Sequence, residues 1–206
     1  MLRSKTLLYA ITLAALPGAA LANGDFYVKL FGGLSDLGAG TLSLNGTSSS
    51  LDLDSGGIFG GAVGYDYGNG PWSAEIEYAY RTADVNSAGM IGTGGDLAST
   101  ALMLNGIYTF DTPGAFTPYV GLGIGVLTEV DIDIDAGSAA GEYNDTGTFA
   151  VQAMLGANYA VSERVSLFGE LRYLSAGSQT LDGPGGSTVD VDYDSFDALV
   201  GLSFRF

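Results

Sequence analysis

The side chains in this sequence that could perform chemistry are carboxylates and a small number of cations. The 206 residues include 23 Asp and Glu, seven Lys and Arg, and neither Cys nor His. The chain therefore lacks thiolate and imidazole nucleophiles, a general base that works near neutral pH, and the usual ligands of zinc, haem and iron–sulfur centres. This composition excludes most hydrolase and redox chemistry, so we expect neither an enzyme nor a bound cofactor.

Several of these charges recur at even spacing within extended segments. Glu75, Glu77 and Arg81 would share one face of a β-strand, because successive side chains point to opposite faces. Because this face carries both signs of charge, we favour an ion-pair network. A catalytic acid/base pair is disfavoured, since general acid–base catalysis depends so often on His. The predicted network comprises Lys29, Glu75, Glu77, Arg81, Glu170, Arg172 and Arg205.

A second set of carboxylates alternates with Val, Ile and Tyr. It consists of Glu129, Asp131, Asp133, Asp135, Asp190, Asp192 and Asp194. Carboxylate oxygens at this density can hold Ca²⁺, although an EF-hand loop would need Gly where Ala136 stands and a later bidentate Glu. We favour hairpin strands with one hydrated face that keep the surface soluble, and cation binding by these segments is the alternative.

The net charge and the N-terminus indicate where the protein works. The net charge of −16 excludes nucleic acid as a partner, because binding to phosphates needs Lys and Arg. Residues 1–22 combine two cations, an apolar stretch and the small-residue sequence Ala20-Leu21-Ala22, so we predict a secretory signal peptide cleaved after Ala22. The apolar run is too short for a membrane-spanning helix.

Eight segments of alternating apolar and small or polar residues must position the charged side chains. Each is long enough for a tilted membrane strand of about 9 to 11 residues. Short turns alternate with long polar loops between them, which is the layout of an outer-membrane barrel. We therefore predict an all-β domain over 23–206, an eight-stranded antiparallel transmembrane β-barrel with up-and-down meander order. The predicted strands are 25–34, 57–67, 72–83, 97–110, 117–130, 147–160, 165–175 and 191–206, and the long loops are 35–56, 84–96, 131–146 and 176–190.

Aromatic residues distinguish a membrane barrel from a soluble β-sandwich. They gather near both ends of the predicted strands, where amphipathic rings meet the two bilayer interfaces. The predicted periplasmic girdle contains Phe26, Tyr65, Tyr67, Trp72, Tyr108, Phe110, Phe116, Tyr119, Tyr159, Phe204 and Phe206, and the opposite belt contains Tyr78, Tyr80, Phe149, Tyr173, Tyr193 and Phe196. Gly121, Gly123 and Gly125 share an inward face, where they leave room for large side chains from opposite strands.

The sequence resembles the eight-stranded outer-membrane β-barrel family, which includes opacity-type porins and OmpA-like transmembrane domains. The resemblance rests on the signal peptide and on segments 26–33, 116–125 and 201–206. It implies a location in the outer membrane of a Gram-negative bacterium, with both termini in the periplasm. It also implies that Gly201, Phe204 and Phe206 form the signal read by the barrel-assembly machinery, although Leu199 stands where that signal usually has a polar residue.

Two functions agree with these observations. The first is a structural or surface-interaction protein, whose acidic extracellular loops meet lipopolysaccharide, cations or host surfaces and whose lumen is filled by charges. The second is a narrow porin for small solutes or ions. The interior of an eight-stranded barrel is just wide enough for side chains to fill, which favours the first. The expected partners are outer-membrane lipid, lipopolysaccharide, the barrel-assembly machinery and divalent cations.

Overall fold

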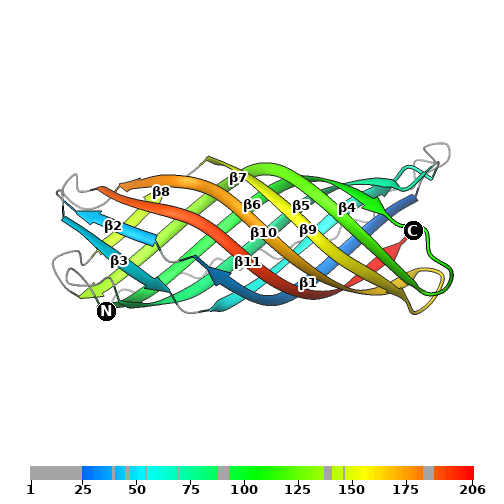
Figure 1. Cartoon of the computed structure of the whole chain (residues 1–206), viewed down its shortest axis with the longest axis horizontal. Coiled ribbons are helices and arrows are strands. Elements are labelled where there is room, and N and C mark those ends of the chain that lie inside the picture. The colour runs from blue at the N-terminus through cyan, green and yellow to red at the C-terminus, as the bar shows by residue number, and fades with distance from the viewer. Residues whose placement is uncertain are drawn as a thin grey trace.

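The computed structural model describes residues 25–206 except 39, 45–46, 54, 69, 88–92, 137–140, 146 and 183–187. The predicted signal peptide lies outside these residues. All regular elements in the described part are β-strands (Figure 1). They are β1 (Asp25–Leu37), β2 (Gly40–Leu44), β3 (Thr47–Leu53), β4 (Gly56–Asp66), β5 (Trp72–Ser87), β6 (Thr93–Thr109), β7 (Phe116–Ala136), β8 (Gly141–Asp145), β9 (Thr148–Ala160), β10 (Val165–Asp182) and β11 (Thr188–Arg205).

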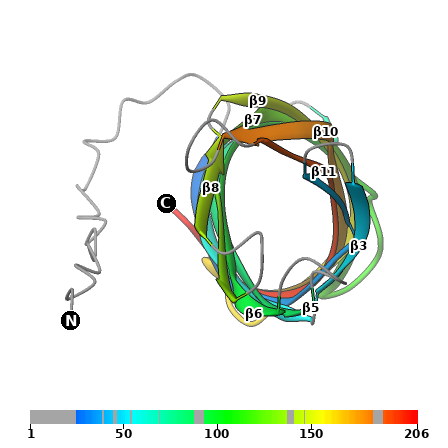
Figure 2. The same cartoon turned by 90° about the vertical axis from the view of Figure 1, so that its left-hand side faces the viewer.

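Eight of these strands close into an antiparallel ring. Pairing runs from β1 through β4, β5, β6, β7, β9 and β10 to β11, which pairs back with β1. Figure 2 looks along the ring from the end where the short strands β2, β3 and β8 extend the wall. There β2 pairs with β3, β3 with β5, and β8 with β7 and β10. The predicted eight-stranded up-and-down barrel is confirmed.

Short turns and the two described chain ends meet at one end of the barrel, on the right of Figure 1. The turns join β4 to β5, β6 to β7 and β9 to β10, and the Phe206 amide donates to the Phe26 carbonyl at 2.9 Å. Gly68 and Gly114 have φ of 68° and 108° in the first two turns, which residues with a Cβ rarely adopt. Outer-membrane barrels have short periplasmic turns, so this end is the periplasmic one.

The strands continue further toward the extracellular end than the eight predicted membrane segments do. β7 has 21 residues, and β10 and β11 have 18 each, whereas about 9 to 11 suffice to cross the bilayer. Parts of all four predicted loops are therefore strand, and β2, β3 and β8 lie wholly within two of them. The alternation of carboxylates with Val, Ile and Tyr at 129–135 and 190–194 predicts hairpin strands there, and β7 and β11 confirm them. The other extensions lack apolar alternation, and backbone hydrogen bonds alone continue their ladders above the membrane.

The outer wall of the barrel is apolar. Leu30, Ile76, Leu122 and Val200 each expose more than half of their surface, and many similar residues surround them. Exposed apolar surface on this scale is expected where hydrocarbon rather than water covers a barrel. No helix in the described part of the chain is long and apolar enough to cross a membrane.

Aromatic rings contact one another at the periplasmic ends of neighbouring strands. The ring centroids of Trp72 and Tyr108 are 5.0 Å apart, and those of Tyr108 and Phe110 are 5.1 Å apart. Two predicted belt members are wrong, because Tyr119 and Tyr193 are buried inside the barrel. Tyr119 is near the start of β7, and Tyr193 is near the end of a predicted strand that continues further in the structure. The alternation of faces turns both rings inward, and Tyr119 shares its inward face with Gly121.

The inward glycines of β7 provide the space that the sequence predicts. A Cβ on Gly123 would collide with the side chains of Asn105 and Gln152. Gly156 lies directly opposite Tyr119 in the ladder, and a Cβ there would collide with the Tyr119 ring. Large side chains can therefore fill the lumen only because small residues face them.

Candidate functional site: the charged lumen

The interior of the barrel holds charged side chains shielded from solvent. Seven are buried in the described part of the chain, three cations and four carboxylates, so one negative charge is in excess. They project inward from β1, β5, β10 and β11, because each occupies the inward parity of its strand. The residues are Lys29, Arg81, Arg172, Glu75, Glu77, Glu170 and Asp197.

Arg172 joins two of the buried carboxylates, Glu77 and Glu170. Its Nη1 and Nη2 atoms donate to the two carboxylate oxygens of Glu77 at 2.6 and 2.9 Å, and its Nη2 and Nε atoms donate to Glu170 Oε1 at 2.6 and 3.1 Å. β10 and β5, which carry Arg172 and Glu77, are four strands apart in a ring of eight. The ion pair therefore spans the barrel from one side to the other.

Neutral polar groups complete the hydrogen bonding around this pair. Asn105 Nδ2 donates to Glu77 Oε2 at 3.2 Å, and Gln152 Nε2 donates to Asn105 Oδ1 at 2.7 Å. The Tyr119 hydroxyl donates to Glu170 Oε2 at 2.8 Å. Buried charges cost least when their remaining lone pairs are satisfied in this way.

Lys29 lies nearer the periplasmic end of the lumen, in the third residue pair of the β1–β11 ladder counted from that end. Its Nζ atom is 2.5 Å from Glu75 Oε1 and 5.0 to 5.6 Å from the ring centroids of Tyr27, Tyr119 and Phe168. The Tyr27 hydroxyl also donates to Glu75, at 2.7 Å. Three aromatic faces and one carboxylate thus stabilise this desolvated ammonium.

A second polar layer contains Arg81. Its Nε and Nη2 atoms donate to Asp197 Oδ2 at 3.2 and 2.7 Å, and the Ser35 hydroxyl donates to Asp197 Oδ1 at 2.7 Å. The hydroxyls of Ser99 and Tyr193 are 2.5 Å apart, and they too come from opposite sides of the ring, β6 and β11. In the described part of the lumen, two hydrogen-bonded links, Arg172–Glu77 and Ser99–Tyr193, therefore join strands on opposite sides of the ring.

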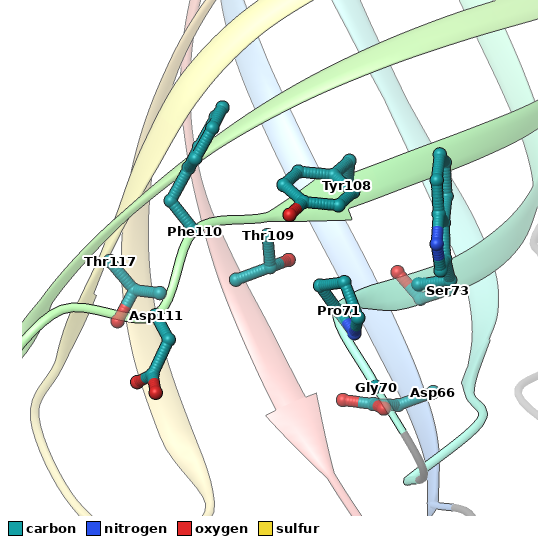
Figure 3. A pocket seen from close by; sticks show the side chains of 10 residues that line it. Asp66, Gly70, Pro71, Ser73, Tyr108, Thr109, Phe110, Asp111 and Thr117 are labelled. Carbon is teal, nitrogen blue, oxygen red and sulfur yellow. The ribbon is translucent and has the colours of Figure 1, made fainter.

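A cavity of about 480 Å³ opens at the periplasmic end, between the β4–β5 and β6–β7 turns (Figure 3). Its lining includes Asp66, Pro71, Thr109 and Asp111. It reaches Ser73, whose Oγ lies within hydrogen-bond distance of the Tyr27 hydroxyl, at 3.2 Å. The same hydroxyl donates to Glu75, so Tyr27 connects the lining residue Ser73 to a buried carboxylate of the lumen.

The comparisons with known proteins agree with this architecture. The model of the outer membrane protein beta-barrel domain family matches residues 6–206. The chain belongs to this family. It is 27% identical to the outer membrane protein PagN of Salmonella typhimurium over 73% of this chain and 74% of PagN. It is also 31% identical to an outer membrane protein of Gluconacetobacter diazotrophicus, over 89% of this chain and 55% of that relative.

Two solved outer-membrane barrels show the same fold. Neisserial surface protein A is 18% identical with a TM-score of 0.57, and the match covers 88% of this chain and 97% of that protein. AlkL, solved in lipid bilayers, is 17% identical with a TM-score of 0.58, and the match covers 94% and 95% of the two chains. This outer-membrane β-barrel protein is thus located in the outer membrane of a Gram-negative bacterium.

The structure brings six of the seven predicted network residues into the lumen of this barrel protein and leaves Arg205 outside. Arg205 is about half exposed at the periplasmic rim, where its guanidinium lies 3.6 Å from Asp25 and 3.2 Å from Asp66. The alternation along β11 gives Arg205 an inward direction. Because it is the last residue of the strand, its side chain lies at the rim, beyond the buried part of the lumen. The prediction also omits Asp197, although the same alternation places Asp197 on the inward face of β11.

The predicted cation-binding carboxylates are only partly described. Glu129 is exposed, and Asp131 and Asp194 are partly buried. The side chains of Asp133, Asp135, Asp190 and Asp192 lie outside the described part of the structure. Among the side chains that are described, no group of three carboxylates could hold a metal ion by itself.

Of the three predicted assembly residues, Gly201 and Phe204 lie on β11, the strand that closes the barrel, and Phe206 directly follows it. Phe204 and Phe206 are exposed and their ring centroids are 5.1 Å apart. Gly201 faces the lumen, since a Cβ there would meet the Phe168 ring and the Leu30 carbonyl oxygen. The hydrogen bond from the Phe206 amide to Phe26 lies at the end of the β1–β11 seam.

Proposed function

We propose that this barrel protein is a closed, non-conducting scaffold with a structural or surface-interaction role. The observation that carries the proposal is the Arg172–Glu77 ion pair, which joins opposite strands across the lumen. An eight-stranded barrel has an interior that side chains can fill, and here ion-paired side chains fill it. A solute moving through would have to separate buried charges, and removing one partner of such a pair costs about 3 to 5 kcal/mol.

Conductance in planar lipid bilayers tests the proposal. We expect the wild-type barrel to show no stable open level, because the two charge layers remain intact. Arg172→Ala should introduce ion leakage, whereas Arg205→Ala, which removes a rim charge, should not. Wide and stable wild-type openings that Arg172→Ala leaves unchanged would overturn the proposal and favour a narrow porin for small solutes or ions.

The surface role is supported by acidic residues on the strands that extend beyond the apolar band. Asp36, Asp84, Asp96 and Glu129 are all exposed. Asp84 and Asp96 lie directly opposite one another on β5 and β6. As part of the proposal, divalent cations link these carboxylates to lipopolysaccharide phosphates. Two carboxylates supply only some of the oxygen ligands that Ca²⁺ takes, and phosphate oxygens would supply others. With neither His nor Cys in the chain, we expect no catalytic activity.

A further inference from the structure

An apolar groove lies in the lipid-facing wall between β7, β9, β10 and β11. Its volume is about 530 Å³. The ladder register explains the hollow, because Pro118 pairs with Ala157 and Ala157 pairs with Gly169, so three adjacent strands carry short side chains at one level. Leu155 and Leu171 pair with each other at the next level and form one wall of the groove.

The depth of the groove places it in the hydrocarbon of the periplasmic leaflet. Gly169 is four residues above Val165, the first residue of β10, which is about 13 Å along a strand. A strand tilt of about 35 to 45° reduces this to about 10 Å of depth. The interfacial layer on each side of a bilayer is about 5 to 7 Å thick, so the groove meets acyl chains while the β9–β10 turn meets headgroups.

The β9–β10 turn carries one charge of each sign. Glu163 and Arg164 are both exposed, and Arg164 forms no ion pair with a carboxylate in the part of the chain that the structure describes. The Arg205 amide donates to the Arg164 carbonyl at 2.8 Å, which fixes the backbone of the turn. A guanidinium is suited to a phosphate, and an adjacent carboxylate is suited to an ammonium group.

We propose that the groove and this turn together bind one phospholipid with a zwitterionic headgroup. One acyl chain lies along Gly169 between Leu155 and Leu171, while the phosphate contacts Arg164 and the ammonium group contacts Glu163. Within a membrane, association depends on close packing and polar contacts rather than on the hydrophobic effect, and this site offers both. A second copy of the barrel fits poorly, because a two-fold interface would place groove against groove and leave the hollow unfilled.

A second groove supplies a matched comparison within the same wall. It has a volume of about 460 Å³, and its lining includes Ala74, Gly106 and Leu122 on β5, β6 and β7. The β6–β7 turn at the periplasmic end of these strands carries the exposed Asp111 and neither Lys nor Arg, so phosphate would meet a carboxylate there. We therefore expect specific lipid retention at Gly169 and not at Gly106.

Native mass spectrometry of the barrel isolated in mild detergent tests the site. The barrel is incubated with equal amounts of phosphatidylethanolamine, phosphatidylglycerol and diacylglycerol, and the lipid retained per barrel is counted. We expect one phosphatidylethanolamine on the wild type, its loss in Gly169→Leu, and its retention in Gly106→Leu. Both glycines accept a Cβ, since the nearest atom at Gly169 is 3.9 Å away and none lies within 4 Å at Gly106. Arg164→Ala should lower retention by about fivefold, as for a partly exposed ion pair.

Three results would overturn the proposal. Equal retention by wild type and Gly169→Leu would show that the groove does not hold the lipid. Equal retention of phosphatidylglycerol or diacylglycerol would contradict the contacts at the turn, and dimers abolished by Gly169→Leu would make the groove a protein interface. Heat-modifiable electrophoretic mobility establishes that each variant is folded, and Gly169→Ala provides a smaller obstruction if the leucine variant does not assemble.

Discussion

The guanidinium of Arg172 determines how the two sides of the lumen are held together. It donates to Glu77 across the barrel and to Glu170 on its own strand, while its Cζ atom lies 5.2 Å from the Phe31 ring centroid. Alternation predicts that these residues share the interior, because parity is a local property of each strand. It cannot predict which carboxylate Arg172 contacts, since that depends on the relative height of strands far apart in the ring.

We predict that Arg172→Ala lowers the free energy of unfolding by about 3 to 5 kcal/mol, because it leaves Glu77 and Glu170 buried without a cation. Arg205→Ala should cost at most about 1 kcal/mol, since its ion pairs with Asp25 and Asp66 are largely exposed to solvent. Urea unfolding in lipid vesicles, followed by heat-modifiable mobility, measures both values. Equal losses of stability in the two variants would contradict a stabilising role of the buried pair.

Strands that extend above the membrane bring like charges together at the level of elements. β5 and β6 continue far enough for Asp84 to lie directly opposite Asp96. Directly opposed like charges destabilise a ladder. The sequence predicts the acidic segments but assigns both aspartates to a loop, because Ser-, Gly- and Asp-rich segments have no apolar alternation even where their backbones pair.

We predict that Asp96→Lys raises the free energy of unfolding by about 0.2 to 1 kcal/mol in the presence of a chelator, because it replaces repulsion between strands with attraction. Ca²⁺ should raise the melting temperature of the wild type through mass action on the native state, and the increment should be smaller in Asp96→Lys. Thermal unfolding with and without Ca²⁺ measures both effects.

Asp36→Lys is the control for this prediction. Asp36 is exposed on β1 and pairs with Phe196, so the substitution makes the same change in net charge without an opposed carboxylate. If Asp36→Lys stabilises the barrel as much as Asp96→Lys, or if the wild type does not respond to Ca²⁺, the carboxylates are simply a hydrated surface.

At the scale of the whole molecule, the last strand of the chain closes the barrel. β11 pairs with β10 along its length and with β1 from Leu37 to Tyr27, so the ring is complete only when the chain's final segment is in place. An even number of alternating segments with short turns at one end predicts this closure. The sequence does not predict how far each strand is shifted along the barrel axis relative to its neighbours. It therefore does not predict that Arg205 lies exposed at the rim.

We predict that deletion of Phe206 leaves export intact and slows insertion into the outer membrane. Phe206 ends the β1–β11 seam, its ring contacts Phe204, and with Gly201 these aromatics form the predicted assembly signal. Pulse-labelling of cell envelopes, with heat-modifiable mobility as the measure of folded barrel, gives the rate of insertion.

Tyr159→Ala is the control for this prediction. Tyr159 is similarly exposed at the same end of the barrel, 55% against 63% for Phe206, but it lies in the interior of the chain. If the loss of one girdle ring were the cause, both variants would be delayed equally. A delay confined to the Phe206 deletion would instead identify the terminal aromatic as a recognition element, and wild-type kinetics in that deletion would refute the prediction.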